Sequence, residues 1–136
     1  MKLSFERTLT TTPAKAFDAW LNPKTPGTPW HENDDLILNV KKNGLWYWLI
    51  DGNVHYGRFL ELKRPGRIQL TWMSRHTLGE ESKVTITFKK QGDETLMTLT
   101  HSDLPKDKRA KAHEGGWNYF LDKLANTFNK KSRKKK

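Results

Sequence analysis

The stretch from Leu104 to Phe128 constrains the fold more than any other part of the chain. Asp103 and Pro105 are suited to cap and open a helix there, and the helix would run for about 24 residues, or about 36 Å. A long helix with a wide apolar stripe, in a chain of 136 residues, needs a sheet to pack on. At helical spacing the ring-bearing and apolar side chains share one side: His113, Trp117, Phe120, Leu121, Leu124 and Phe128.

The pair Gly115-Gly116 interrupts the middle of this predicted helix. Two glycines in a helix interior cost about 2 kcal/mol relative to two alanines. Two explanations for the pair remain open from the residues alone. Either the helix packs very closely on a strand, or a gap is left beside Trp117 for a ligand.

The residues before this helix predict a mostly antiparallel sheet. Residues 2–10 alternate as a half-buried strand, and Thr12-Pro13 opens a short helix that ends at Leu21. A proline-rich connector follows, and Trp30 is predicted to lie on a second short helical turn at its end. Six strands are predicted after it. The first spans 35–42 and is followed by Asn43-Gly44, a dipeptide typical of β-hairpin turns. The pattern indicates one α+β domain over residues 1–129.

Composition excludes several classes of protein. The chain has no cysteine, so disulfides, thiol nucleophiles and cysteine metal sites are excluded. No apolar run approaches the length of a membrane span, and the first residues lack a signal-peptide core, so we expect a cytoplasmic protein without a transmembrane segment. Three further histidines, His31, His55 and His76, are not spaced like the ligands of a metal site. We therefore expect no metal and no cofactor.

The net charge of +10 is concentrated at the C-terminal end. Six of these charges lie in residues 130–136, which leaves +4 for residues 1–129. A terminal basic run is typical of a solvated tail, so we predict that 130–136 is disordered and adds only nonspecific affinity for polyanions. We therefore expect no specific nucleic-acid partner.

Several motifs, in order, resemble the activator of Hsp90 ATPase homologue family of the START/Bet v 1-like superfamily. They are TTPAKAFDAW, NGLWYW, YGRFLELKRPGRIQLTW, TLMTLTHSDLP and HEGGWNYFLDKLANTF, and the match runs from Phe5 to Phe128. The resemblance implies a helix-grip fold of order β-α-α-β6-α, in which a curved antiparallel sheet wraps around the C-terminal helix. It also implies a cavity between the sheet and that helix, which superfamily members use for hydrophobic molecules.

The resemblance and the inward strand faces together give three functional hypotheses. The first is a noncatalytic, monomeric domain that binds a small hydrophobic or aromatic molecule. The second is an interaction with an Hsp90-type chaperone, and the third is an enzyme of the polyketide cyclase or aromatase type, for which no acid–base pair can be assigned. The alternative for the interior is a solid core without a cavity.

The candidate ligand-binding residues lie on the inward strand faces and on the helix stripe. Trp30 is placed near the mouth, and His101 and His113 are candidate polar contacts. For His101 the alternative is a structural hydrogen bond at the strand-to-helix turn, helped by Ser102 and Asp103. The predicted walls are Trp46, Trp48, Trp72, Met97, Trp117, Phe120 and Leu121.

Overall fold

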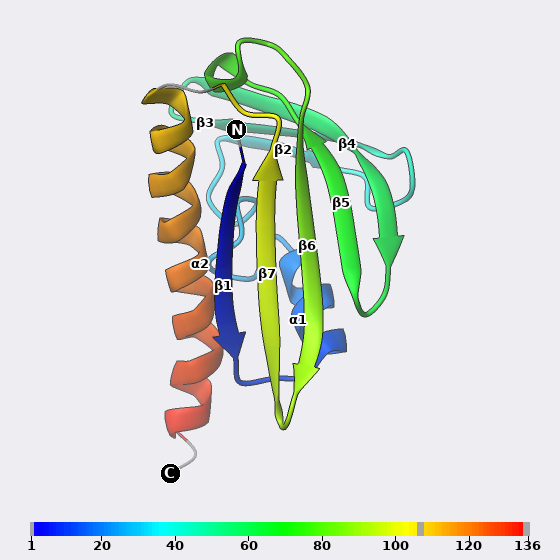
Figure 1. Cartoon of the computed structure of the whole chain (residues 1–136), viewed down its shortest axis with the longest axis vertical. Coiled ribbons are helices and arrows are strands. Elements are labelled where there is room, and N and C mark those ends of the chain that lie inside the picture. Colours follow the sequence, from blue (N-terminus) through cyan, green and yellow to red (C-terminus); the bar gives the residue numbers. More distant parts are fainter. Residues whose placement is uncertain (1, 106–107, 135–136) are drawn as a thin grey trace.

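A computed structural model describes the backbone of residues 2–105 and 108–134, and their side chains except at positions 76, 109 and 130–134. Seven antiparallel strands form one sheet in the order β1-β7-β6-β5-β4-β3-β2, so the first strand pairs with the last. Figure 1 shows the long central strands side by side, with the C-terminal helix alongside β1. The strands are β1 (Leu3–Leu9), β2 (Asp35–Leu38), β3 (Leu45–Ile50), β4 (Asn53–Lys63), β5 (Arg67–Trp72), β6 (Ser82–Gln91) and β7 (Glu94–Ser102).

Two α-helices accompany the sheet, α1 (Pro13–Trp20) and α2 (Lys108–Lys134), together with a 3-10 turn, η1 (Arg75–Thr77). The buried stripes of both helices join the inward strand residues in one hydrophobic cluster. As predicted, Thr12 caps α1, since its hydroxyl accepts a hydrogen bond from the Lys15 N–H at 3.3 Å. The fold is therefore α+β, a curved antiparallel sheet with a long C-terminal helix, as expected from the sequence.

Strand β4 pairs with β3 from Asn53 to Arg58 and with β5 from Phe59 to Lys63. A bridge between Tyr56 and Met73 extends the second pairing, so the two overlap. A register irregularity lies between Phe59 and Glu61. Such a bulge puts one extra residue into the strand and switches the side that later residues face. The bulge explains why the apolar residues of this strand do not follow one alternation in the sequence, since Tyr56, Leu60 and Leu62 favour one face and Phe59 favours the other.

Three predicted elements differ from those observed. The second short helix is absent, because the segment between α1 and β2 forms a series of turns. Strand β2 ends at Leu38 and not at position 42, and Val40 is exposed. Asp103 is not the predicted helix cap, because it takes a left-handed conformation (φ 64) and residues 104 and 105 are not helical. Helix α2 is described from Lys108, and 106–107 lie outside the described residues. Helix α2 continues to Lys134; the disordered tail predicted for 130–136 stays a prediction, and positions 135 and 136 lie outside the described residues.

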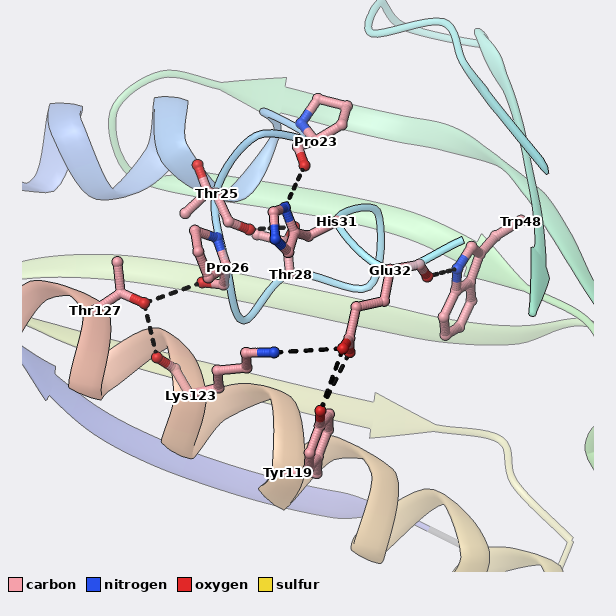
Figure 2. Close-up of polar contacts among 10 residues, drawn as sticks. All are labelled: Pro23, Thr25, Pro26, Thr28, His31, Glu32, Trp48, Tyr119, Lys123 and Thr127. Carbon is pink, nitrogen blue, oxygen red and sulfur yellow. Dashed lines mark hydrogen bonds and ion pairs between the residues drawn. The ribbon is translucent and has the colours of Figure 1, made fainter. Parts of the chain in front are cut away.

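The connector between α1 and β2 is attached directly to α2 (Figure 2). Gly27 has φ +95, and a Cβ added there would lie 2.2 Å from the backbone nitrogen of Leu124. Farther along, the Glu32 carboxylate accepts a hydrogen bond from the Tyr119 hydroxyl at 3.2 Å and pairs with the Lys123 ammonium at 3.4 Å. The connector therefore packs against the middle and C-terminal part of α2.

Candidate functional site

A cluster of tryptophan rings fills the interior between α2 and the sheet, and Trp72 lies at its centre. Ring centroids of the neighbouring tryptophans lie between 4.7 Å and 6.4 Å from that of Trp72. Tilted and edge-on contacts of this kind are favourable for aromatic rings. The four neighbours are Trp30, Trp46, Trp48 and Trp117.

The indole N–H groups of three of these tryptophans are hydrogen-bonded to backbone carbonyls. Trp30 donates to the carbonyl of Trp20 at 3.0 Å. Trp46 donates to Thr71 at 3.1 Å, and Trp48 donates to the carbonyl of Glu32 at 2.8 Å (Figure 2). Because a buried N–H needs a partner, these bonds fix the rings in a packed core.

Trp72 differs from its neighbours. It is 3% exposed, and its buried Nε1 has no hydrogen-bond partner among the described residues. An unsatisfied buried donor costs about 1–3 kcal/mol. The cluster therefore contains one indole donor that the described protein groups leave unused.

His101 connects α2 to two strands through hydrogen bonds. Its Nδ1 accepts from the indole N–H of Trp117 at 3.0 Å, so the ring proton of the neutral imidazole is on Nε2. This Nε2–H donates to the Ser82 hydroxyl at 2.8 Å, and that hydroxyl donates to the carbonyl of Trp72 at 2.6 Å. The structural hydrogen bond expected for His101 is therefore present, but its partners are Trp117 and Ser82, whereas Ser102 and Asp103 were expected.

Burial is the main cause that lowers the pKa of His101 from 6.5 to about 3, and the electrostatic effect of nearby His113 contributes in the same direction. The two imidazole rings lie edge to face with centroids 5.0 Å apart. His101 is therefore neutral across the ordinary pH range. It is suited to hold Trp117 in place, and both of its ring nitrogens are occupied by protein groups.

A pocket of about 180 Å³ lies between the first half of α2 and the ends of β4 and β5. It is open on one side. Phe120 and Trp117 form its wall on the helix, and His55 and Trp72 form its wall on the sheet. The complete lining is His55, Trp72, Ala112, His113, Gly116, Trp117 and Phe120.

The glycine pair of α2 lies at this pocket. A Cβ added to Gly115 or to Gly116 would meet no atom within 4 Å, so neither glycine is required by close packing on a strand. Gly116 lines the pocket, whereas Gly115 is exposed and does not. The gap beside Trp117 is the explanation that agrees with the structure.

The predicted site residues fall into two groups. Four of them line the pocket, namely Trp72, His113, Trp117 and Phe120. The others lie in the packed core outside the lining, and Trp30, expected near the mouth, is completely buried because the connector folds inward over it. These core residues are Trp30, Trp46, Trp48, Met97, His101 and Leu121.

Three residues that line the pocket were not predicted to form its walls. They are His55, Ala112 and Gly116. Ala112 lies one helical turn before Gly116 (i, i+4), so the helical spacing contained a signal for it. His55 is harder to find, because the bulge in β4 disguises its inward face. Its ring lies 4.5 Å from that of Trp48.

Neither a metal centre nor a membrane span is found in the described part of the chain. Among these residues no group of three or more histidine, aspartate or glutamate side chains could hold a metal ion. No helix formed by them is long and apolar enough to cross a membrane.

The fold and the pocket define a helix-grip domain, and the sequence places it in a family. Residues 10–129 match the family described as Activator of Hsp90 ATPase homolog 1-like protein. The match spans most of the chain, which therefore belongs to this family. No curated protein sequence matches the chain significantly.

Solved structures with the same fold come from several organisms. A Plasmodium falciparum protein described as an HSP90 activator is 22% identical (TM-score 0.75; 90% of this chain and 91% of that one covered). Protein MLL2253 from Mesorhizobium loti is 19% identical (TM-score 0.78; 96% and 98%). An Aha1 from Colwellia psychrerythraea, described as a dimer, is 15% identical (TM-score 0.74; 94% and 96%). At these identities the likeness shows the fold alone.

Proposed function

We propose that this protein binds a small molecule, of about the size of one aromatic ring, in the pocket beside Trp117. The observation that carries the proposal is Gly116. Because glycine has no side chain, the backbone of α2 itself borders the pocket at this position. A glycine in a helix interior costs about 1 kcal/mol of stability relative to alanine. Nothing in the packing of the helix requires that cost, whereas keeping a pocket open does.

The size of the pocket limits the ligand. Its volume of about 180 Å³ is below the range of about 300–1,000 Å³ that is usual for drug-sized ligands. An apolar cavity of about 150 Å³ is known to hold benzene. The pocket therefore favours a monocyclic compound over the fatty acids and sterols that fill larger helix-grip cavities.

The chemistry of the lining also limits the ligand. The seven lining residues include no carboxylate, lysine or arginine, and three of them contribute six-membered or indole rings. The imidazoles of His55 and His113 supply polar atoms on opposite walls. This lining suits a neutral ring with a hydroxyl or carbonyl substituent, which can stack on the aromatic walls and meet an imidazole.

The test is an NMR titration with phenol and acetophenone, with oleate as a compound too large for the pocket. We expect saturable shifts of the Trp72 and Trp117 indole signals with the first two compounds only. Gly116→Leu should fill the pocket and abolish the shifts. Gly115→Leu, one residue away and exposed, should leave them unchanged. Equal behaviour of the two variants, or no shifts with any monocyclic compound, would refute the proposal.

Interaction with an Hsp90-type chaperone is the second candidate function. It is supported by the family match over residues 10–129 and by the Plasmodium falciparum relative that is described as an HSP90 activator. The test is the ATPase rate of the host's chaperone at low salt, with and without this protein. An unchanged rate together with no binding would remove this candidate.

An enzyme of the cyclase type would need an acid or a base at the site. His101 is not suited to that role, because both of its ring nitrogens are bonded within the protein. We therefore propose no reaction for this site.

A further inference from the structure

The outer face of β2, β3 and the first half of β4 carries an apolar patch, which the segment from Ser74 to Gly79 borders beside Val54 and Tyr56. The face opposite the tryptophan cluster is polar over most of the sheet, but it is apolar here. Ile37 is 57% exposed, Leu45 65%, Tyr56 43% and Val54 42%. Contiguous exposed patches of this kind mark interaction surfaces. We call the following residues the outer patch: Ile37, Leu45, Tyr47, Leu49, Val54 and Tyr56.

The register of the strands arranges the outer patch in rows. Ile37 lies opposite Tyr47, and Tyr47 lies opposite Tyr56, so these three side chains form a central row across the strands. Leu49 and Val54 form a second row on one side. Strand β2 is the edge of the sheet, and an unpaired edge is a second feature that favours association.

The two ends of the outer patch carry opposite charges. Asp34, Asp35 and Asp51 lie at the end where Leu49 and Val54 pair, and all three are exposed. Arg75 of η1 also lies beside Val54, so this end carries three negative charges and one positive charge. The other end, beside Leu45, is cationic. Its exposed side chains are Lys41, Lys42 and Arg58.

None of these seven charged groups forms an ion pair within the described part of the chain. Each end therefore presents its net charge to solvent. The apolar rows between the ends keep the two net charges apart. The patch is thus polarised along the strand direction.

We propose that the outer patch binds a second copy of this chain, in a symmetric dimer. The charge pattern specifies the symmetry. A two-fold axis along the central row turns the second patch end for end, so that the acidic end of one copy faces the cationic end of the other. An axis along the strands would place like charges together. The pattern is self-complementary only in the first arrangement.

This symmetry assigns the contacts. Residues of the central row meet their own equivalents, so Ile37 of one copy packs on Ile37 of the other. Asp35, on β2, faces the opposite end of the partner's β2 segment, where Lys41 and Lys42 lie. Val54 likewise faces Arg58 on β4. The inference replaces the monomer expected from the sequence and is independent of the pocket.

The first experiment is sedimentation velocity over a range of concentrations at fixed ionic strength. We expect the full chain to shift from monomer to dimer as its concentration rises. Ile37→Lys would place two ammonium groups on the axis and should weaken dimerisation about tenfold or more. The matched control is Thr98→Lys, on the same side of the sheet but on β7. A wild-type chain that stays monomeric, or equal effects of both variants, would overturn the proposal.

The second experiment is a charge swap. Asp35→Lys alone and Lys41→Glu/Lys42→Glu alone should each fail to dimerise, because each places like charges in contact. A mixture of the two should form a heterodimer, since the positive charge introduced by Asp35→Lys in one chain then faces the negative charges introduced by Lys41→Glu/Lys42→Glu in the other. Asp93→Lys and Lys89→Glu/Lys90→Glu, exposed at the β6–β7 turn, match the charge changes and should alter nothing. Homodimers of the single-sided variants, or no heterodimer, would overturn the assigned contacts.

Discussion

The indole N–H of Trp117 on α2 donates a hydrogen bond to Nδ1 of His101 on β7, across 3.0 Å. This contact joins the helix to the sheet at the back of the pocket. It also determines the tautomer of His101, which in turn determines that the ring must donate to Ser82. One helix residue thereby sets the hydrogen bonding of two strands.

Removal of the Ser82 hydroxyl should be costly. In Ser82→Ala the Nε2–H of His101 and the carbonyl of Trp72 both lose a buried partner. An unsatisfied buried group costs about 1–3 kcal/mol, so the free energy of unfolding should fall by at least that amount in urea denaturation. Ser102→Ala, at the end of the same strand as His101, is the control and should change it by less than about 0.5 kcal/mol. Equal losses would show that the hydrogen-bond relay is unimportant.

The pKa of His101 predicts a dependence of stability on pH. The ring has a pKa of about 3 in the folded protein, against 6.5 as its ordinary value. Above pH 6.5 both states are neutral and His101 has no effect. Below it the unfolded state binds a proton that the folded state excludes, so the free energy of unfolding falls by about 1.4 kcal/mol per pH unit.

Denaturant titrations between pH 7.5 and pH 4.5 measure this effect. His101→Gln retains a neutral donor and acceptor but cannot titrate. We expect its stability to fall less steeply than that of the wild type as the pH is lowered. Parallel curves for the two proteins would contradict the lowered pKa.

The fold was predictable because its signals are local. The alternation of Met97, Leu99 and His101 showed the inward face of β7, and all three are buried. The stripe of α2 identified Trp117 and Phe120 as residues that face the sheet. Such periodicities depend only on the geometry of one element.

The site was predictable only in part because it depends on how elements meet. Ser82 on β6 bonds to His101 on β7 across two paired strands, in which His101 lies opposite Val84, so this contact depends on the register between the strands. His55 was hidden by the bulge in β4, and Trp30 was misplaced because Gly27 lets the connector approach α2 closely. These three depend on contacts between distant segments.

Replacement of the glycine pair by alanine should stabilise the protein. A Cβ at Gly115 or at Gly116 meets nothing within 4 Å, so each variant should gain up to about 1 kcal/mol from helix propensity. Thermal unfolding should show a higher midpoint for both Gly115→Ala and Gly116→Ala. A loss of stability in either would indicate that the helix needs the flexibility of the pair.

Gly27 should tolerate an alanine poorly, because its backbone conformation and the space around it both oppose a side chain. It has φ +95, and the Cβ of an alanine would lie 2.2 Å from the Leu124 nitrogen, in the backbone of α2. Helix and connector would both have to move. The control is Gly52→Ala, which also has a positive φ (+77) but meets nothing within 4 Å, so it isolates the conformational cost, about 1–2 kcal/mol.

We expect Gly27→Ala to cost at least about 2 kcal/mol more than Gly52→Ala, since overpacking against backbone adds to the conformational term. Denaturant unfolding of the two variants gives this difference directly. The Trp30 indole, which is buried under the same connector, should also change its NMR signal in Gly27→Ala alone. If the two variants were equally stable, the connector would not be packed on α2 at this point, and the burial of Trp30 would need another cause.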